Sequence, residues 1–168
     1  MTNKVALFLA HAVAMEQEAA DRYEELADTM DVHNNGDVAE LFRQMAKYSR
    51  LHGASVAQRA SGYDLPKLKS WQFRWNTPEP PEVGDFVGGH YLMTPYHALE
   101  FALENERRGH QFYAGEAARN EDATVRAMAA EMAAEEVEHV SELEAWIART
   151  PVPDADWADD PDEAVVPD

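Results

Sequence analysis

Apolar residues recur every three or four positions along most of this 168-residue chain, and that spacing predicts α-helices. The first apolar stripe lies within residues 3–30 and ends before a turn-rich run at 31–36. A second stripe lies within residues 37–60, where Asp37 followed three positions later by Glu40 predicts a capping pair. The short turn between the stripes predicts that the second helix folds back antiparallel on the first.

Two more helices are predicted in the second half of the chain. Thr94 before Pro95 is typical of a helix start, and the stripe that follows predicts a third helix over about 95–119. After a tight turn at Asn120, the last stripe predicts a fourth helix that ends near Arg149. This second pair is therefore expected to be antiparallel, like the first.

A long connection, residues 61–93, separates the two pairs and is rich in proline and aromatic residues. About 30 residues can cross the length of such a helix with slack. We therefore predict an all-α domain over residues 1–150, a ferritin-like antiparallel four-helix bundle with one long crossover between helices two and three. An up-and-down bundle with an excursion in the middle would satisfy the same lengths.

The C-terminal tail, residues 151–168, has seven acidic residues and no basic one. So strong a charge with so few apolar side chains predicts solvated disorder. Trp157 is the residue that could pin part of the tail to the bundle.

The charge balance narrows the range of partners. Lysine and arginine number 14 against 32 acidic residues, a formal charge of −18, which argues against a nucleic-acid or anionic-membrane partner. The absence of cysteine excludes disulfides, thiolate nucleophiles, cysteine-ligated zinc and iron–sulfur clusters. Any metal must therefore bind to carboxylate and imidazole groups.

No apolar stretch approaches the length of a transmembrane helix. The apolar run at 5–10 followed by small residues at 12–14 resembles an export signal with its cleavage site. The helical spacing continues past that point to Tyr23, as in a folded helix, so we expect a cytoplasmic protein.

The two helix pairs resemble one helical hairpin used twice. Glu16 and Tyr23 in the first pair recur as Glu106 and Tyr113 in the second, at identical spacing. The positions that match between the second and fourth helices are Leu41, Met45, Ala46 and His52 with Met128, Met132, Ala133 and His139.

Several polar residues lie inside the apolar stripes and are expected to face the core. They are Glu16, Glu106, Glu136, His139 and, by the repeat, His52. Burying an ionised carboxylate without a partner is very costly, and no cation lies in the stripe of the fourth helix. A pair of divalent metal ions would neutralise the cluster, because residues three apart share a helix face and can reach one ion. The alternatives are a hydrogen-bonded polar pair at 136 and 139 and a satisfied core histidine at 52.

These motifs, over roughly residues 3–149, resemble the di-iron domain of the rubrerythrin family. The resemblance implies two iron ions, with zinc or manganese as alternatives in the isolated protein. The implied ligands are Glu16 and His52 for one iron, Glu106 and His139 for the other, and Glu136 as a bridge. It also implies that the hydroxyls of Tyr23 and Tyr113 bond to ligand carboxylates.

One position departs from the family pattern. Where the second helix would carry Glu-x-x-His, the chain has Ser49-x-x-His52, and a neutral hydroxyl is a poor metal ligand. The second ion is therefore expected to bind more weakly, or to share hydroxide or another side chain as its bridge. His110, one turn after Glu106, could be that substitute, with an outward or supporting role as the alternative; Tyr48 is a weaker candidate.

The leading hypothesis is a rubrerythrin-like non-haem iron protein, a di-iron oxidase or peroxidase that reduces peroxide or O₂. Because the chain has no cysteine for a rubredoxin-type iron, its electrons would come from a separate donor protein. A homodimer is expected. The second hypothesis is a non-catalytic metal-binding or structural bundle whose site degraded at Ser49, and a third is an iron-handling ferritin-like protein.

Overall fold

Four long α-helices form the described part of the chain, which covers residues 3–69 and 92–158 of a computed structural model. They are α1 (Lys4–Val32), α2 (Gly36–Arg59), α3 (Pro95–Arg119) and α4 (Ala123–Ile147). The predicted helix bounds agree with these to within two residues, because the apolar stripes and turn residues mark each end.

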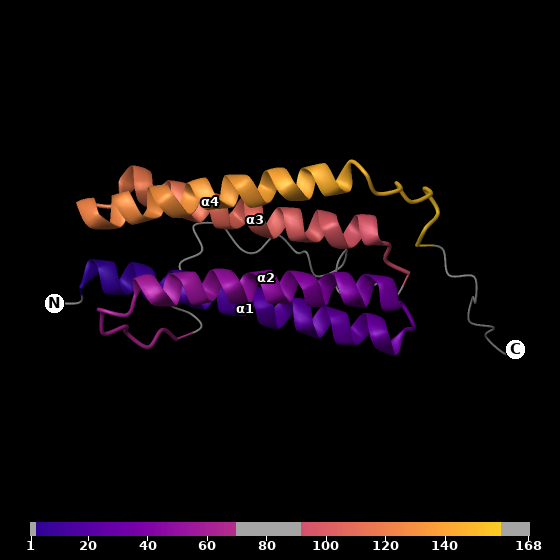
Figure 1. The fold of residues 1–168 in the computed structure, drawn as a ribbon, viewed down its shortest axis with the longest axis horizontal. Coiled ribbons are helices and arrows are strands. Elements are labelled where there is room, and N and C mark those ends of the chain that lie inside the picture. Colours follow the sequence, from indigo (N-terminus) through magenta and orange to yellow (C-terminus); the bar gives the residue numbers. More distant parts are fainter. Residues whose placement is uncertain (1–2, 70–91, 159–168) are drawn as a thin grey trace, which may run out of the picture.

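The helices form two antiparallel hairpins that lie against each other, α1 with α2 and α3 with α4 (Figure 1). Figure 1 shows α2 and α3 running in the same direction, so the connection between them joins opposite ends of the bundle. This direction confirms the ferritin-like arrangement and excludes the up-and-down bundle, in which α3 would run against α2. Most of the predicted crossover, residues 70–91 with their tryptophans and prolines, lies outside the described residues.

Two asparagines build the turn between α1 and α2. Asn34 has a φ of 58°, in the left-handed region that ends helices, and Asn35 directly precedes α2. The side chain of Asn35 does not cap α2 but donates a hydrogen bond to the carbonyl oxygen of Met93 at 2.5 Å. The predicted capping pair of Asp37 and Glu40 is therefore wrong, because α2 begins earlier and Asp37 lies in its first turn.

The core consists of two apolar clusters separated by a polar layer. One cluster, at the end where α1 meets α2, packs around Tyr23, Phe42 and Leu99. The other, at the opposite end, packs around Phe8 and Val125. The two clusters share no residue, and every helix passes through the layer between them.

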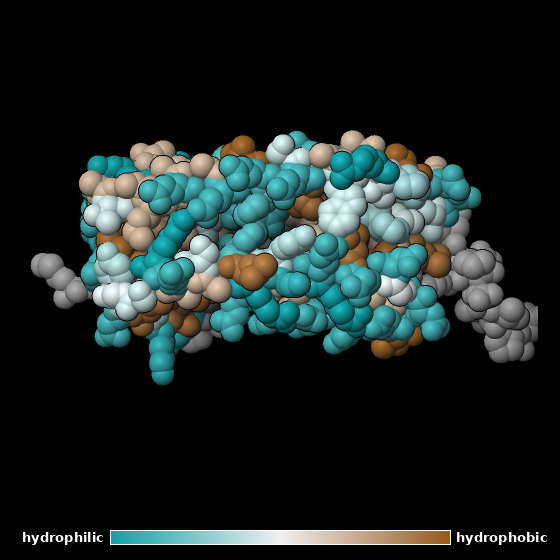
Figure 2. All heavy atoms as spheres, viewed as in Figure 1, coloured by the Kyte–Doolittle hydropathy of each residue, from teal (hydrophilic) through white to brown (hydrophobic). Residues whose placement is uncertain are grey.

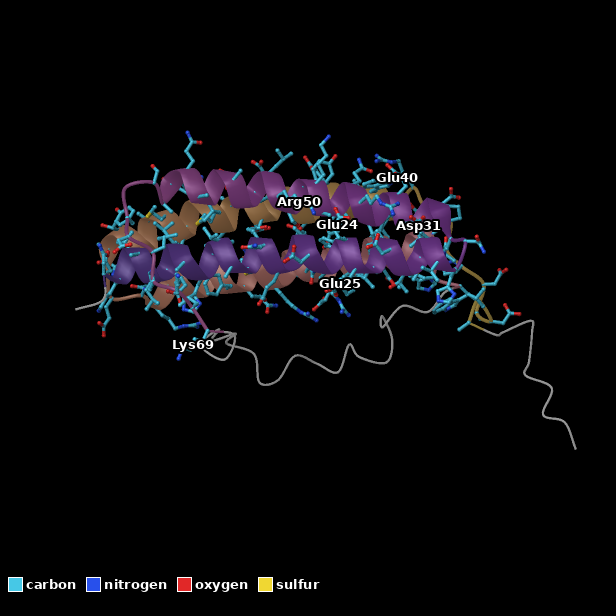
Figure 3. All side chains as sticks on the ribbon, turned by 90° about the horizontal axis from the view of Figure 1, so that it is seen from below. Glu24, Glu25, Asp31, Glu40, Arg50 and Lys69 are labelled. Atoms are coloured by element: carbon cyan, nitrogen blue, oxygen red, sulfur yellow. The ribbon has the colours of Figure 1, made fainter. Side chains whose placement is uncertain are left out.

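The outward faces are largely hydrophilic, as Figure 2 shows for one side of the molecule. Ion pairs link neighbouring helices there: Arg50 Nη1 of α2 lies 2.7 Å from Glu24 Oε1 of α1 (Figure 3). Exposed pairs of this kind contribute at most about 1 kcal/mol each, so apolar packing dominates the stability of the bundle. Within the described ranges, no helix has both the length and the apolar character needed to cross a membrane.

The start of α3 has the predicted cap at Thr94, and the C-terminal tail contacts it. The backbone N–H of Thr94 donates to Nδ1 of His97 at 3.2 Å, which closes the first turn. The ring of Trp157 lies against the His97 ring, with 3.9 Å between their centroids. The part of the tail that reaches Trp157 is therefore anchored through the residue that the sequence singled out for this role. Residues 159–168, for which the sequence predicts solvated disorder, lie outside the described residues.

Truncation of the chain after Thr150 tests this anchor. We expect the shortened protein to keep its helical circular dichroism, because the last described helix ends at Ile147. It should lose about 1 kcal/mol of stability, the contribution of one aromatic contact, and therefore a few degrees in melting temperature. Trp157→Ala in the full chain should reproduce the loss. Unchanged melting temperatures in both variants would show that the contact is energetically neutral.

Candidate metal centre

The polar layer between the two apolar clusters receives titratable side chains from every helix. Helix α1 provides Glu16, α2 provides His52, α3 provides Glu106, and α4 provides Glu136 and His139. Glu16 and Glu136 are only 7% and 5% exposed, and the other three are half-buried. The structure thus brings together all five predicted ligands, and their binding of metal stays a prediction.

Short contacts link the five side chains. His139 Nδ1 lies 3.4 Å from Glu106 Oε2 and 3.3 Å from Glu136 Oε2. His52 Nδ1 lies 3.9 Å from Glu16 Oε2. Across residues 3–69 and 92–158, the ion-pair partners recorded for these carboxylates are histidines rather than lysine or arginine. The carboxylates therefore depend on protons or metal ions for neutralisation.

The two imidazole rings of the cluster lie face to face. The centroids of His52 and His139 are 4.0 Å apart, and the ring planes differ by 7°. Ligand atoms of these histidines and Glu106 lie within 4.8 Å of one another, which is close enough for all three to reach one ion. An imidazole lone pair lies in the ring plane, however, and an ion between two parallel rings would lie well outside both planes. Parallel rings suit two ions side by side, which in two-metal sites are about 3.5–4 Å apart.

In the absence of metal ions, protons neutralise the cluster. Burial, with repulsion from Glu136 and Glu106, raises the pKa of Glu16 to about 8. Burial also raises the pKa of Glu136 to about 8, and hydrogen bonds to Glu106 and Glu136 raise the pKa of His139 to about 10. Burial opposes ionisation of Glu106, but hydrogen bonds with His139 and Glu136 lower its pKa overall. Near neutral pH, Glu16, Glu136 and His139 are therefore protonated beside an ionised Glu106.

Two buried tyrosines lie on opposite sides of the centre, one in each apolar cluster. The Tyr23 hydroxyl accepts a hydrogen bond from Asn105 Nδ2 at 3.1 Å. Tyr113 is 1% exposed, and its hydroxyl has no hydrogen-bond partner in the described part of the chain. Among the described residues, neither hydroxyl makes a hydrogen bond to a ligand carboxylate in this arrangement, and the expected bonds stay a prediction.

Comparison with known proteins gives two matches to this architecture. The family model for rubrerythrin matches residues 8–84, which include Glu16 and His52. The crystal structure of an uncharacterized conserved protein from Magnetospirillum magnetotacticum MS-1 is 55% identical, and the match covers 90% of this chain and 99% of that one with a TM-score of 0.68. The chain belongs to the rubrerythrin family. Among curated proteins, the comparison found no match.

In this rubrerythrin-family chain, one of the expected ligand positions differs between the two hairpins. Ser49 is 3% exposed and precedes His52 by three residues, as Glu136 precedes His139. The serine side chain is shorter than glutamate and carries no charge. The α1–α2 hairpin therefore contributes one carboxylate to the centre, whereas the α3–α4 hairpin contributes two.

The two predicted substitutes for the missing carboxylate differ in burial. His110 is half-buried, and its role as a substitute ligand stays a prediction. Tyr48 is exposed on the outer side of α2. Solvent or a bound anion is the other source of a bridge at Ser49.

The donor set and its packing fit a pair of transition-metal ions in this rubrerythrin-family bundle. Imidazole and carboxylate ligands suit iron, manganese and zinc. A Cβ at Gly109 would lie 3.3 Å from both Cδ and Oε1 of Glu136, so the glycine leaves room for this carboxylate. The buried Tyr113 hydroxyl is an unused donor close enough for the charge of Glu16 to raise its pKa.

Sequence reasoning missed three residues around the centre: Asn105, Gly109 and Arg59. Asn105 and Gly109 act through contacts with Tyr23 and Glu136 that helical spacing alone does not reveal. Arg59 of α2 forms an ion pair with Glu135 of α4. The available signal was that Arg59 is two helical turns from His52 on the same face.

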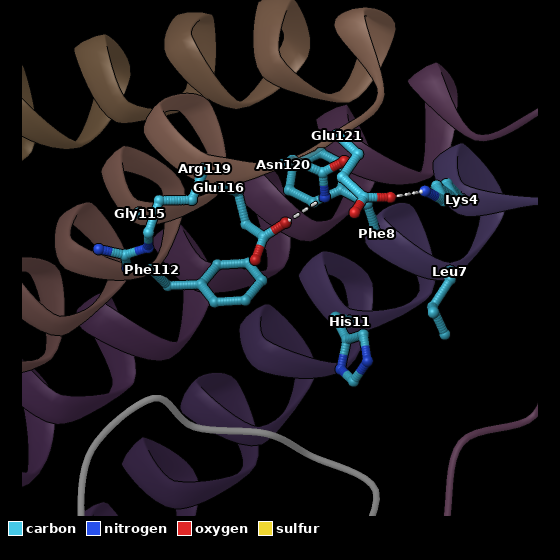
Figure 4. Close-up of a pocket in the computed structure, with 10 residues that line it drawn as sticks. All are labelled: Lys4, Leu7, Phe8, His11, Phe112, Gly115, Glu116, Arg119, Asn120 and Glu121. Atoms are coloured by element: carbon cyan, nitrogen blue, oxygen red, sulfur yellow. Dashed lines mark hydrogen bonds and ion pairs between the residues drawn. The ribbon is translucent and has the colours of Figure 1, made fainter.

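An open pocket of about 450 Å³ lies between the start of α1 and the end of α3 (Figure 4). At its rim Lys4 pairs with Glu121, and Asn120 donates a hydrogen bond to Glu116 at 2.6 Å. The pocket lining contains His11 but none of the predicted metal ligands. The pocket is therefore separate from the metal centre.

Proposed function

We propose that this protein is a rubrerythrin-type di-iron oxidase or peroxidase, which reduces peroxide or O₂ with electrons from a separate donor protein. The observation that carries the proposal is the pair of parallel imidazoles, each with its own carboxylate. His52 lies beside Glu16, and His139 lies beside Glu106. This arrangement supports two neighbouring ions rather than one.

The chain's own residues would hold and shield such a pair. Glu16 and His52 would hold one iron, Glu106 and His139 the other, and Glu136 would bridge them. When bound, a ferrous pair supplies the two electrons that peroxide reduction consumes. The apolar clusters flank the polar layer on both sides, and four helices hold the ligands in place.

A non-catalytic metal-binding or structural bundle is the second candidate, and Ser49 is the observation that favours it. Three carboxylates leave one positive charge of two ferrous ions unbalanced, which weakens binding of the second ion. The homodimer and the cytoplasmic location expected from the sequence stay predictions.

Anaerobic titration with ferrous iron, followed by exposure to peroxide and to O₂, separates the two candidates. We expect two irons per chain, and oxidation should produce new absorbance in the near ultraviolet and visible with consumption of one peroxide per iron pair. A protein that binds two irons but consumes no peroxide or O₂ would support the non-catalytic bundle. A protein that binds no iron would contradict the metal centre itself.

Ser49→Glu tests whether the second bridge limits metal binding. We expect the variant to bind the second ion more tightly, because the added carboxylate balances the remaining positive charge. Without metal it should be less stable by about 1–3 kcal/mol, because the new group is buried. Iron stoichiometry and melting temperature measure both effects, and Ser55→Glu on the exposed side of α2 is the control. Weaker iron binding in Ser49→Glu than in the wild type would show that the centre is organised around the serine.

A further inference from the structure

Two buried polar atoms near the metal centre have no hydrogen-bond partner among the described residues: Nη1 of Arg59 and the hydroxyl oxygen of Tyr113. Both groups are donors, and leaving a buried donor unpaired costs free energy, more so for a charged group. A hydrogen-bond acceptor for these two donors would therefore have to come from a bound ligand or solvent, because the described protein residues do not provide one.

The helices place these two groups together on one side of the centre. Arg59 follows His52 by seven residues on α2, and Tyr113 follows Glu106 by seven residues on α3, about two turns in each case. Helices α2 and α3 run in the same direction (Figure 1). Seven residues past its ligand, each helix has therefore advanced from the centre toward the same end of the bundle. Helical side chains lean toward the N-terminus of their helix, so both long side chains extend back toward the metal ligands.

Electrostatic and packing observations agree with this placement. Burial and the charges of Glu16 and Glu136 raise the pKa of Tyr113, whereas the charge of Arg59 works to lower it. The hydroxyl is therefore within electrostatic range of both the centre and the guanidinium. The other guanidinium nitrogen, Nη2, is bonded to Glu135 of α4, which fixes the orientation of the group.

The internal repeat shows that this feature is specific to one side of the centre. Tyr23, the counterpart of Tyr113 in the first hairpin, has a hydrogen-bond partner in Asn105, which donates to its hydroxyl oxygen. The residue that corresponds to Asn105 in the first hairpin is Met15, which has no such donor. Among the described residues, buried side-chain polar atoms without any hydrogen-bond partner occur only on the side that contains Arg59 and Tyr113.

We propose that Arg59 and Tyr113 form a donor pair that binds a small monovalent anion at this side of the metal centre. The guanidinium N–H and the phenol O–H would donate to the same anion while the metal ions attract its charge. In the proposed reaction the bound species would be hydroperoxide, so this inference rests on the proposed function. Azide, of similar size and charge, is the probe.

The experiment uses full-length protein loaded with Co²⁺, whose visible spectrum reports changes at the metal. Cobalt stoichiometry is measured first, and azide is then titrated into the wild type and four variants. Arg59→Met should weaken azide binding about ten- to hundredfold, the effect of losing a charge-assisted hydrogen bond. Tyr113→Phe should weaken it by a smaller factor, because the neutral donor is weaker.

Two variants separate anion binding from a purely structural role of Arg59. Glu135→Gln removes the negative charge that pairs with Arg59 but keeps a hydrogen-bond acceptor, so azide should bind more tightly than in the wild type. Arg107→Met removes a comparable but exposed pair with Glu144 between α3 and α4, and it should leave azide binding unchanged.

The possible results distinguish this proposal from the proposed function. A wild-type protein that binds no cobalt would refute the metal centre and the anion site together. A protein that binds cobalt but gives equal azide affinities in the wild type and Arg59→Met would refute the anion site alone. If Arg59→Met does not fold, Glu135→Gln decides: tighter azide binding supports the site, and equal or weaker binding overturns it.

Discussion

Glu136→Ala should strongly weaken the binding of both metal ions, whereas His52→Ala should weaken mainly the ion that His52 shares with Glu16. The reason is position: Glu136 Oε2 lies 3.3 Å from His139 Nδ1, in the middle of the cluster, while His52 lies at the side of Glu16. Loss of a residue that only supports a ligand costs roughly 10- to 100-fold in metal affinity, so loss of a shared ligand should cost more. Metal analysis after dialysis of iron-supplemented protein measures the difference.

A matched variant tests whether the loss of metal binding is confined to the centre or reflects a change in the fold. Glu136→Gln keeps the shape of the side chain, removes its charge and should also lose metal. Its circular dichroism should match that of the wild type. The glutamine side chain is uncharged, so it can be buried without taking up a proton. Equal metal content in the wild type, Glu136→Ala and Glu136→Gln would refute the assigned centre.

Metal binding should release protons and strengthen steeply as the pH rises from 6 toward 8. Near neutral pH, Glu16 and Glu136, each with a pKa of about 8, and His139, with a pKa of about 10, are all protonated. Metal ligation requires the deprotonated forms, so loading the centre should release roughly two to three protons. Titration with Zn²⁺ in a weakly buffered solution, followed with a pH indicator, counts them. Fewer than one released proton per chain would contradict the protonation states described here.

The same groups make a prediction about stability when no metal is bound. Their pKa values are raised in the fold, so the folded chain holds more protons than the unfolded chain above the ordinary pKa values of 4.5 and 6.5. The stabilisation is present below those values and is lost as the pH rises through about 8 and then about 10. The melting temperature of chelator-treated protein should therefore fall from pH 6 to pH 10, and Glu136→Gln should fall less. A melting temperature that rises over this range would contradict the raised pKa values.

The helices and the five clustered side chains could be predicted from the sequence because both follow from helical spacing. Glu136 and His139 share a face of any helix that contains them, and the repeat extends this argument to Glu16, His52 and Glu106. The length of residues 61–93 allows α3 to begin at either end of the bundle; the predicted crossover places its start opposite the end of α2, and the structure confirms that direction.

Other features depend on side-chain conformations and on distances between helices, which no spacing rule contains. The capping pair at Asp37 failed because α2 begins one residue earlier, and its N-cap residue Asn35 donates its side-chain hydrogen bond to Met93, 58 positions away in the chain. The unpaired hydroxyl of Tyr113 could not be predicted, because the repeat implied the same environment for it as for Tyr23. The difference arises from a single substitution in the repeat, Asn105 in one hairpin and Met15 in the other.

The division of the bundle into two hairpins has a consequence for the order in which the protein assembles. Helix contacts are concentrated within α1–α2 and within α3–α4, so each hairpin can form from neighbouring sequence before the two meet. The predicted ligands come from both hairpins, and an ion held by His139 and a second held by His52 would share Glu136. Metal would then act as a cross-link between the hairpins, and cellular iron supply would determine how firmly the two halves of the newly made chain are joined.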